Sequence, residues 1–224
     1  ECKVVKNKQA RDHLSDEQGI VLHLNRATQE LTEDTTFQVP AASKLEVSTV
    51  SAEVETRRVG GAQRINSVSG NLGLDVATAP VEVKTVSGDV TLRGGGGSTT
   101  VRLSSVSGDV RIERLGGELE ANTVSGDLQL ALGTLRSLRL RSTSGDLSLR
   151  GALERDASLE AESVSGDLDL RLAAAAGFDL DAESFSGDIA TCYGARGSSS
   201  GMGPGNALRS KRGDGGARLR IKTM

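Results

Sequence analysis

The chain has 224 residues, of which 36% are hydrophobic and only 2% aromatic. Its net charge of -3 gives no reason to expect a nucleic-acid partner, because nucleic-acid-binding domains usually present a strongly basic face. No run approaches the roughly 18 apolar residues of a membrane-spanning helix, so we expect no membrane span in this chain.

Residues 1–40 carry no clear repeat and are expected to form an irregular N-terminal rung or cap. Alternation over Ile20 to Leu24 predicts a strand, preceded by a polar loop. The only two histidines, His13 and His23, lie here and are expected at surface or strand positions. The chain opens at Glu1 without a basic-then-apolar leader, so we expect a removed leader or a fragment.

Residues 41–224 are predicted to form one repeat domain. A degenerate first copy around Leu45 to Val54 has Ala52 where later copies have glycine. After it, Ser-Gly followed by Asp or Asn recurs at intervals of 18, 20, 18, 19, 21 and 21 residues. We call the glycines of this motif the corner glycines: Gly70, Gly88, Gly108, Gly126, Gly145, Gly166 and Gly187.

An alternating apolar and polar run precedes and follows each corner glycine, which is typical of two half-buried strands joined by a tight corner. Units of about twenty residues cannot bury an apolar face alone and must stack on their neighbours. The sequence therefore predicts an all-β fold, a single β-solenoid (β-helix) of about 18–21 residues per coil with eight to nine rungs.

Stacking in register predicts two inward columns of small aliphatic residues, which also explains the scarcity of aromatic residues. A leucine-rich repeat matches only locally, around Leu135 to Leu140, and the Gly-Gly-x-Gly-x-Asp nonapeptide of the calcium-binding β-roll does not occur. The first column follows the corner and the second precedes it: Leu72, Val90, Val110, Leu128, Leu147, Leu168 and Ile189; and Val83, Leu103, Ala121, Leu140, Ala161 and Ala182.

Near the C-terminus, a segment rich in glycine and serine at about residues 194–216 is predicted to be a flexible loop. Residues 217–223 alternate again, and Lys222-Thr223-Met224 aligns with Lys84-Thr85-Val86. A Ser-Gly step should follow, so we expect truncation or a last rung beyond Met224.

The two cysteines, Cys2 and Cys192, leave several pairings open. They could pair with each other, both be free, or one could pair outside this chain. Lipid anchoring at Cys2 is a further alternative, which Glu1 disfavours because a small residue is expected before an anchoring cysteine.

The acidic column is the most suggestive candidate surface. Stacked carboxylates could be bridged by calcium, which prefers several oxygen ligands. The interpretation we favour is structural: each aspartate accepts a backbone N–H in its own corner and faces water, and no metal or other cofactor is expected. The column comprises Asp89, Asp109, Asp127, Asp146, Asp167 and Asp188, with Asn71 at its start.

Other motifs are interpreted as structural. The corner serines have no histidine nearby in sequence, so we expect no catalytic triad. Arg212-Gly213-Asp214 matches an integrin-binding tripeptide by chance, and the glycine pattern at residues 201–205 lacks the strand and helix of a nucleotide-binding loop. The basic residues between Arg209 and Lys222 could contact anionic lipid, but a solvated solenoid end is the better interpretation.

Repeats of the Ser-Val-Ser-Gly-Asp-Val type at this spacing resemble a bacterial adhesin-like family of unknown function, over roughly residues 40–224. The resemblance implies an extracytoplasmic protein of the periplasm or cell surface, involved in adhesion or in envelope-stress signalling, and supplies no catalytic residues. Members often end in another rung with a cysteine, which implies that the natural partner of Cys192 is missing here.

Three functions follow as hypotheses. The first is a non-enzymatic envelope module that presents a repetitive surface to a protein or glycan partner. The second is an envelope-stress regulatory module that contacts a membrane protein through its C-terminal loop. The third is a polysaccharide-cleaving β-helix enzyme, which would need clustered bases and arginines that the regular columns do not provide. Sequence alone gives no oligomeric state.

Overall fold

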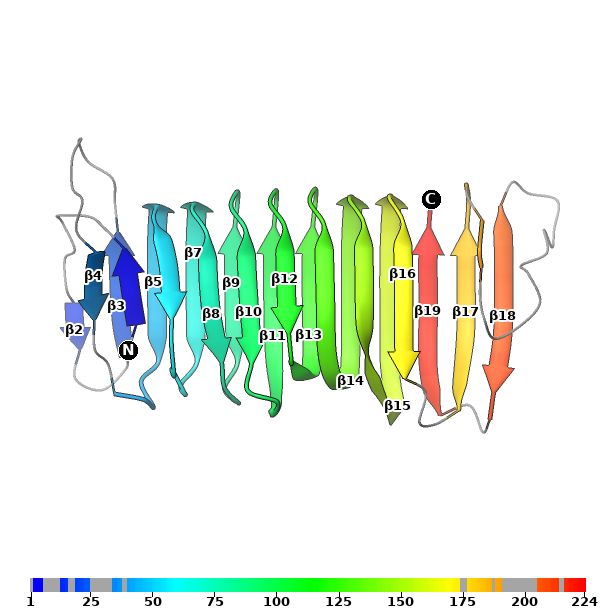
Figure 1. Ribbon diagram of the computed structural model, residues 1–224, viewed down its shortest axis with the longest axis horizontal. Coiled ribbons are helices and arrows are strands. Elements are labelled where there is room, and N and C mark those ends of the chain that lie inside the picture. The colour runs from blue at the N-terminus through cyan, green and yellow to red at the C-terminus, as the bar shows by residue number, and fades with distance from the viewer. Residues whose placement is uncertain are drawn as a thin grey trace.

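The computed structural model is an elongated β-solenoid with the strands stacked side by side along its length (Figure 1). It describes residues 40–173, 177–186, 188–190, 205–213 and 216–224, together with the backbone of four N-terminal strands. The all-β prediction is confirmed: the solenoid has about seven turns with a spacing of about 19 residues.

Strands that precede each corner form what we call the pre-corner sheet. Neighbouring strands pair in parallel except at the two ends, where β2 (His13–Ser15) with β3 and β17 with β18 are antiparallel. In spatial order the sheet consists of β3 (Gly19–Leu24), β5 (Leu45–Ser51), β7 (Gln63–Ser69), β9 (Val81–Thr85), β11 (Ser98–Ser105), β13 (Gly116–Thr123), the second halves of β14 (Leu128–Ser144) and β15 (Leu147–Ser165), β19 (Ala217–Thr223), β17 (Phe178–Ser184) and β18 (Asn206–Arg212).

Strands that follow each corner form the post-corner sheet. Its parallel part consists of β6 (Glu53–Thr56), β8 (Leu72–Val76), β10 (Val90–Gly94), β12 (Val110–Glu113), the first halves of β14 and β15, and β16 (Leu168–Ala173). At the N-terminal end, β1 (Cys2–Val5) pairs antiparallel with β6 and with β4 (Asp34–Phe37), while β2 (His13–Ser15) pairs with β3.

Aliphatic side chains from the two sheets form one continuous core. The predicted column after the corner is confirmed from Leu72 to Leu168 by consecutive parallel pairings. Ile189 lies outside any strand and is half-buried, so it does not extend this column as predicted.

The order of the last strands differs from the predicted one. We expected Ala182 to follow Ala161 in the second column, but Ile221 of β19 lies between them. The chain passes through β17 and β18 and then returns, so that its last strand inserts between β15 and β17 (Figure 1). The alignment of Lys222 with Lys84 is confirmed, because Lys222 pairs with Glu162 in the outward column that contains Lys84.

Part of the predicted C-terminal loop is a strand. Residues 206–212 form β18, which pairs along its whole length with β17, so the prediction of a loop over 194–216 was wrong there. Leu208 of β18 is buried on the inner face, and this burial stabilises the strand. The glycine-rich sequence around it gave no indication of a strand here. Gly187, Cys192 and Asp214 lie outside the described residues, as does the side chain of Cys2.

Candidate functional site

Each corner brings the backbones of two neighbouring rungs close together at a glycine. Gly88 has a φ of 115°, and a Cβ built there would overlap the carbonyl oxygen of Gly70 one rung away. The same geometry recurs at every described corner glycine, whereas the degenerate first copy has Ala52. Only glycine fits because the chain needs both a positive φ and close approach of two backbones.

Corner hydroxyl groups form two further columns. The Ser87 hydroxyl donates to the carbonyl oxygen of Val68 on the preceding rung at 3.2 Å, and Thr85, buried beneath it, donates to the carbonyl oxygen of Ser87 at 3.2 Å. Other copies repeat both bonds. In the first copy the buried Thr49 hydroxyl has no hydrogen-bond partner. The corner serines therefore tie neighbouring rungs together, as predicted for a structural column, whereas the buried hydroxyl groups brace their own corner.

The aspartate column is linked along the solenoid in a way that the sequence did not indicate. Oδ1 of Asp109 accepts the backbone N–H of Asp127, the next rung's aspartate, at 2.9 Å. The pattern begins with Asn71, whose Oδ1 accepts from Asp89, and it continues to Asp167. The prediction that each aspartate bonds within its own corner was therefore wrong, because its carboxylate lies beneath the N–H of the adjacent rung.

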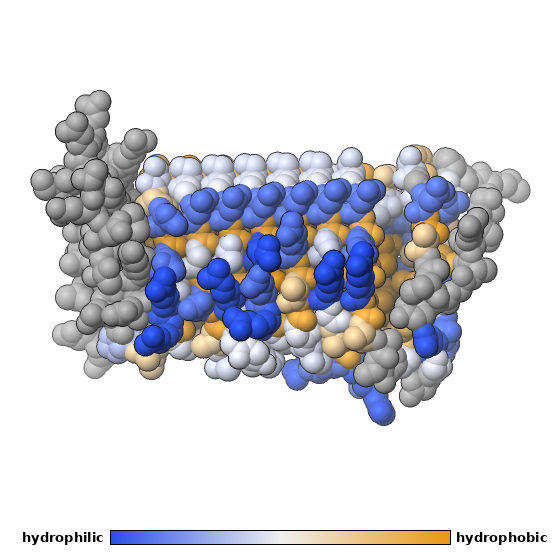
Figure 2. Space-filling model, viewed as in Figure 1, coloured by the Kyte–Doolittle hydropathy of each residue, from blue (hydrophilic) through white to orange (hydrophobic). Residues whose placement is uncertain are grey.

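These aspartates are exposed except for Asp127, which is half-buried, and Figure 2 shows a row of hydrophilic residues along the length of the solenoid, beneath a paler row at its rim. Asp188 is also exposed, but it lies outside the strands. Within the described part of the chain, no three histidine, cysteine, aspartate or glutamate residues are grouped so that they could hold a metal ion. The described residues also include no helix with the length and hydropathy needed to cross a membrane.

The outer face of the pre-corner sheet carries an apolar stripe. Each member immediately follows the inward-facing threonine or serine at the end of its strand and points outward at the corner end. We call this set the valine stripe; in spatial order it comprises Val50, Val68, Val86, Val106, Val124, Thr143, Val164, Met224 and Phe185.

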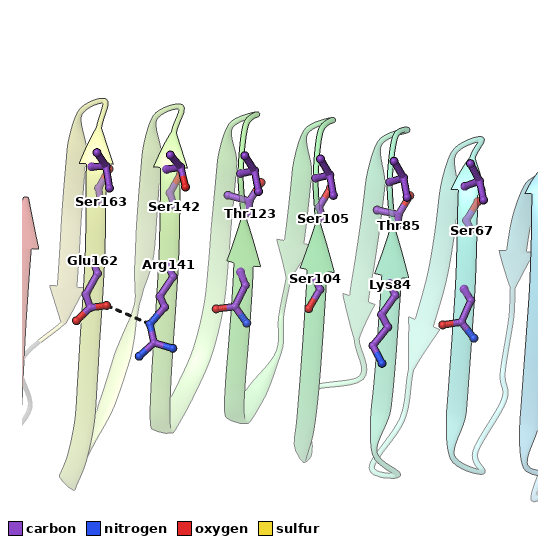
Figure 3. A pocket seen from close by; sticks show the side chains of 18 of the residues that line it. Ser67, Lys84, Thr85, Ser104, Ser105, Thr123, Arg141, Ser142, Glu162 and Ser163 are labelled. Carbon is purple, nitrogen blue, oxygen red and sulfur yellow. Dashed lines mark hydrogen bonds and ion pairs between the residues drawn. The ribbon is translucent and has the colours of Figure 1, made fainter.

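Eight of the nine members account for every exposed large hydrophobic side chain among the described residues, with exposures from 43% to 71%. A shallow groove of about 1130 Å³ lies along this stripe, over eight consecutive strands of the pre-corner sheet. Its second wall is the next outward column, which includes Lys84, Ser104, Arg141 and Glu162 (Figure 3). Within that wall Arg141 and Glu162 form an ion pair at 3.0 Å.

A third outward column on the same face alternates in charge at every step. Arg64 pairs with Glu82 at 3.1 Å, and Arg139 pairs with Glu160 at 2.9 Å. We call this set the charge column; in spatial order it comprises Glu46, Arg64, Glu82, Arg102, Glu120, Arg139, Glu160, Arg220, Asp181 and Arg209.

Ion pairing on this face shifts the pKa of two of its charged groups. Hydrogen bonds from Lys84 and then Arg64 lower the pKa of the Glu82 carboxyl, and the bond to Glu160 raises the pKa of Arg139. Both shifts favour the charged form of the group concerned, so Glu82 and Arg139 are charged at neutral pH.

Sequence reasoning missed both columns, although the signals were present. The inward residues Val81, Val83 and Thr85 set the phase of the strand, so Val86, one position later, must face outward. A hydrophobic residue that recurs in the outward phase of successive copies marks an apolar surface. The alternating charges from Glu46 to Glu160 were visible once the copies were aligned, and only the last three positions depend on placing the last strand before residue 178.

The comparison with protein families agrees with this architecture. The family model described as Toastrack DUF4097, a domain of unknown function, matches residues 14–168 and again residues 117–224. The chain belongs to the Toastrack family. The two overlapping matches are what a Toastrack solenoid should produce, because its rungs can be aligned to the same model in more than one register. Searches of curated proteins and of solved structures each give no significant match.

Proposed function

We propose that this Toastrack chain is a non-enzymatic binding or scaffold module, and that its binding face is the outer surface of the pre-corner sheet. The observation that carries the proposal is the valine stripe, which gathers the exposed large hydrophobic side chains of the described residues into one line. Contiguous exposed apolar surface of this kind marks an interaction site, because leaving it in water is unfavourable.

The chemistry of this face favours a protein over a glycan. Aliphatic side chains offer no hydrogen bonds to the hydroxyl groups of a sugar, and burying those groups without partners is costly. A protein surface with its own apolar residues would cover the stripe and leave the neighbouring charged columns to select the partner.

We also propose that the protein works outside the cytoplasm, in the bacterial cell envelope. This part of the proposal is supported by the resemblance of the Ser-Val-Ser-Gly-Asp-Val repeats to the adhesin-like family. Adhesion would use a binding face of this type. The regulatory alternative would place the contact on the C-terminal segment instead of the stripe.

Site-specific photocrosslinking tests the face. A photoreactive residue at Val106 should capture a protein in the source cells, and Val124→Asp should abolish the adduct. The same residue at Arg111, exposed on the post-corner strand β12, is the matched control and should capture nothing. Adducts from both positions or from neither would overturn the proposed face.

The triple variant Asp109→Asn, Asp127→Asn and Asp146→Asn separates this face from the aspartate column. We expect the Val106 adduct to persist in it, because the stripe lies on the pre-corner strands and the aspartates lie across the corner. Loss of the adduct in a folded triple variant would transfer the binding role to the aspartates.

A further inference from the structure

The order of charges along the charge column is complementary to the same order read in the opposite direction. It has ten positions and alternates without interruption from Glu46 to Arg209. An even, alternating series read backwards places a base opposite every acid. Two such columns laid face to face and antiparallel therefore pair opposite charges at all ten positions, with Glu120 opposite Arg139 at the centre.

The same operation also matches the valine stripe. The two molecules are related by a two-fold axis that lies between their docked faces, parallel to the strands and level with the gap between β13 and β14. This axis reverses the order of the rungs in the second molecule, so each column faces the same column of the other molecule. Val106 then lies opposite Val164, and Val124 lies opposite Thr143, so apolar surface covers apolar surface. The rungs of the two molecules share one strand spacing of about 4.8 Å, so their columns remain in step along the whole contact.

From these two columns we infer that the partner of the valine stripe is a second copy of this chain, bound antiparallel across the outer faces of the two pre-corner sheets. The inference rests on the proposed function and names the partner of the same site. It creates an isologous interface, in which one patch is complementary to itself.

The size of the face suits a stable dimer. Ten strands of about seven residues present about 1,000 Å² at standard strand dimensions, compared with about 800 Å² per partner in a typical specific interface. In the second outward column the operation places Lys84 opposite Lys222. Each of these flexible lysines already has an acidic neighbour on its own chain, Glu82 at 2.7 Å and Glu183 at 3.9 Å.

Charge reversal at the centre of the interface provides the test. By sedimentation equilibrium we expect the wild-type chain to be a dimer at about 100 µM. Glu120→Arg places two arginine pairs across the axis, and Arg139→Glu places two glutamate pairs there. Each single variant should dimerise at least about 100-fold more weakly than wild type.

The double variant Glu120→Arg with Arg139→Glu is the matched control. Within one chain, each single variant and the double variant create the same number of like-charged neighbours, two, with Arg102 and Glu160 as the flanking residues. Across the axis the double variant again pairs opposite charges, so it should dimerise. An equimolar mixture of the single variants should form a heterodimer.

In the association measurements, any of four results would overturn the second copy as partner: a monomeric wild type, single variants that dimerise as well as wild type, a double variant that stays monomeric, or a mixture without heterodimer. Val124→Asp gives an independent reading if the charge variants fail to fold, because Val124 is exposed and its substitution should leave a folded monomer. A Val106 adduct with a different protein would overturn this inference and leave the proposed function standing; the absence of any adduct would overturn both.

Discussion

At the scale of single residues, the corner glycines are required for two separable reasons. Gly108 has a φ of 108°, and a Cβ there would overlap the Gly88 carbonyl oxygen. Gly96 has a positive φ of 84° but open space around it, and Gly73 has neither constraint. These three glycines therefore separate backbone strain from steric contact between rungs.

We expect Gly108→Ala to lower the free energy of unfolding by at least about 2 kcal/mol, because it combines strain with a clash against backbone. Gly96→Ala should cost about 1 kcal/mol from strain alone, and Gly73→Ala less than about 0.5 kcal/mol. Denaturant unfolding followed by circular dichroism measures all three. Equal losses at positions 96 and 108 would show that the approach of the two rungs contributes little.

The aspartate column can be tested by keeping or removing one acceptor. Asp127→Asn retains the Oδ1 that accepts the Asp146 N–H at 2.9 Å and removes a charge from the column, so stability should stay within about 0.5 kcal/mol of wild type. Asp127→Ala removes the acceptor and should cost about 1 kcal/mol. Melting temperatures should not respond to calcium or to a chelator; a rise with calcium would favour the metal-bridged alternative.

Residue-level prediction from the sequence succeeded where a position has one geometric solution. Glycine before aspartate at a fixed period required a corner, and the corner required a positive φ. It failed for the aspartate acceptors because an N–H in the same corner and one on the next rung are both within reach of a short side chain. Only the rise between rungs decides between them.

At the scale of elements, charge explains why the last strand inserts between β15 and β17. If β17 followed β15 directly, Glu160 would stack on Asp181 and Glu162 on Glu183, and like charges directly opposite each other destabilise a sheet. With β19 between them, Arg220 pairs in register with Glu160 and Asp181, and Lys222 with Glu162 and Glu183. A prediction that stacks the strands in chain order is therefore wrong at the C-terminal end of the solenoid.

Arg220→Glu tests this explanation. It restores an acidic run from Glu160 to Asp181 and should loosen β19 and β17, so that amide hydrogen exchange over residues 178–184 becomes about tenfold faster. Arg218→Glu is the matched control, since its in-register neighbours are Ser158 and Asp179 and it creates only one acidic contact. Unchanged exchange in Arg220→Glu would assign the strand order to core packing instead.

At the scale of the whole molecule, the solenoid is a stack in which each rung contacts its neighbours. Its period and its all-β architecture could be predicted, because every repeat has the same pattern of inward apolar residues. The binding face was harder to recognise, since an outward valine in one copy is an ordinary exposed residue. From Val50 to Val164 it becomes a surface once the repeats are aligned, whereas the places of Met224 and Phe185 depend on the strand order at the C-terminal end.

The shape of the particle in solution separates the proposed dimer from association through strand edges. Two rods joined face to face and antiparallel form four sheet layers instead of two, which adds two sheet spacings, about 20 Å, to the thickness but almost nothing to the length. Small-angle X-ray scattering should therefore give wild type a maximum dimension within about one fifth of that of the Glu120→Arg monomer. Pairing of β18 edges would instead join the rods end to end and nearly double that dimension, because β18 is the last of the described strands in its sheet (Figure 1). A doubled length would show that the solenoid assembles through its open end, and that the valine stripe is left for another protein.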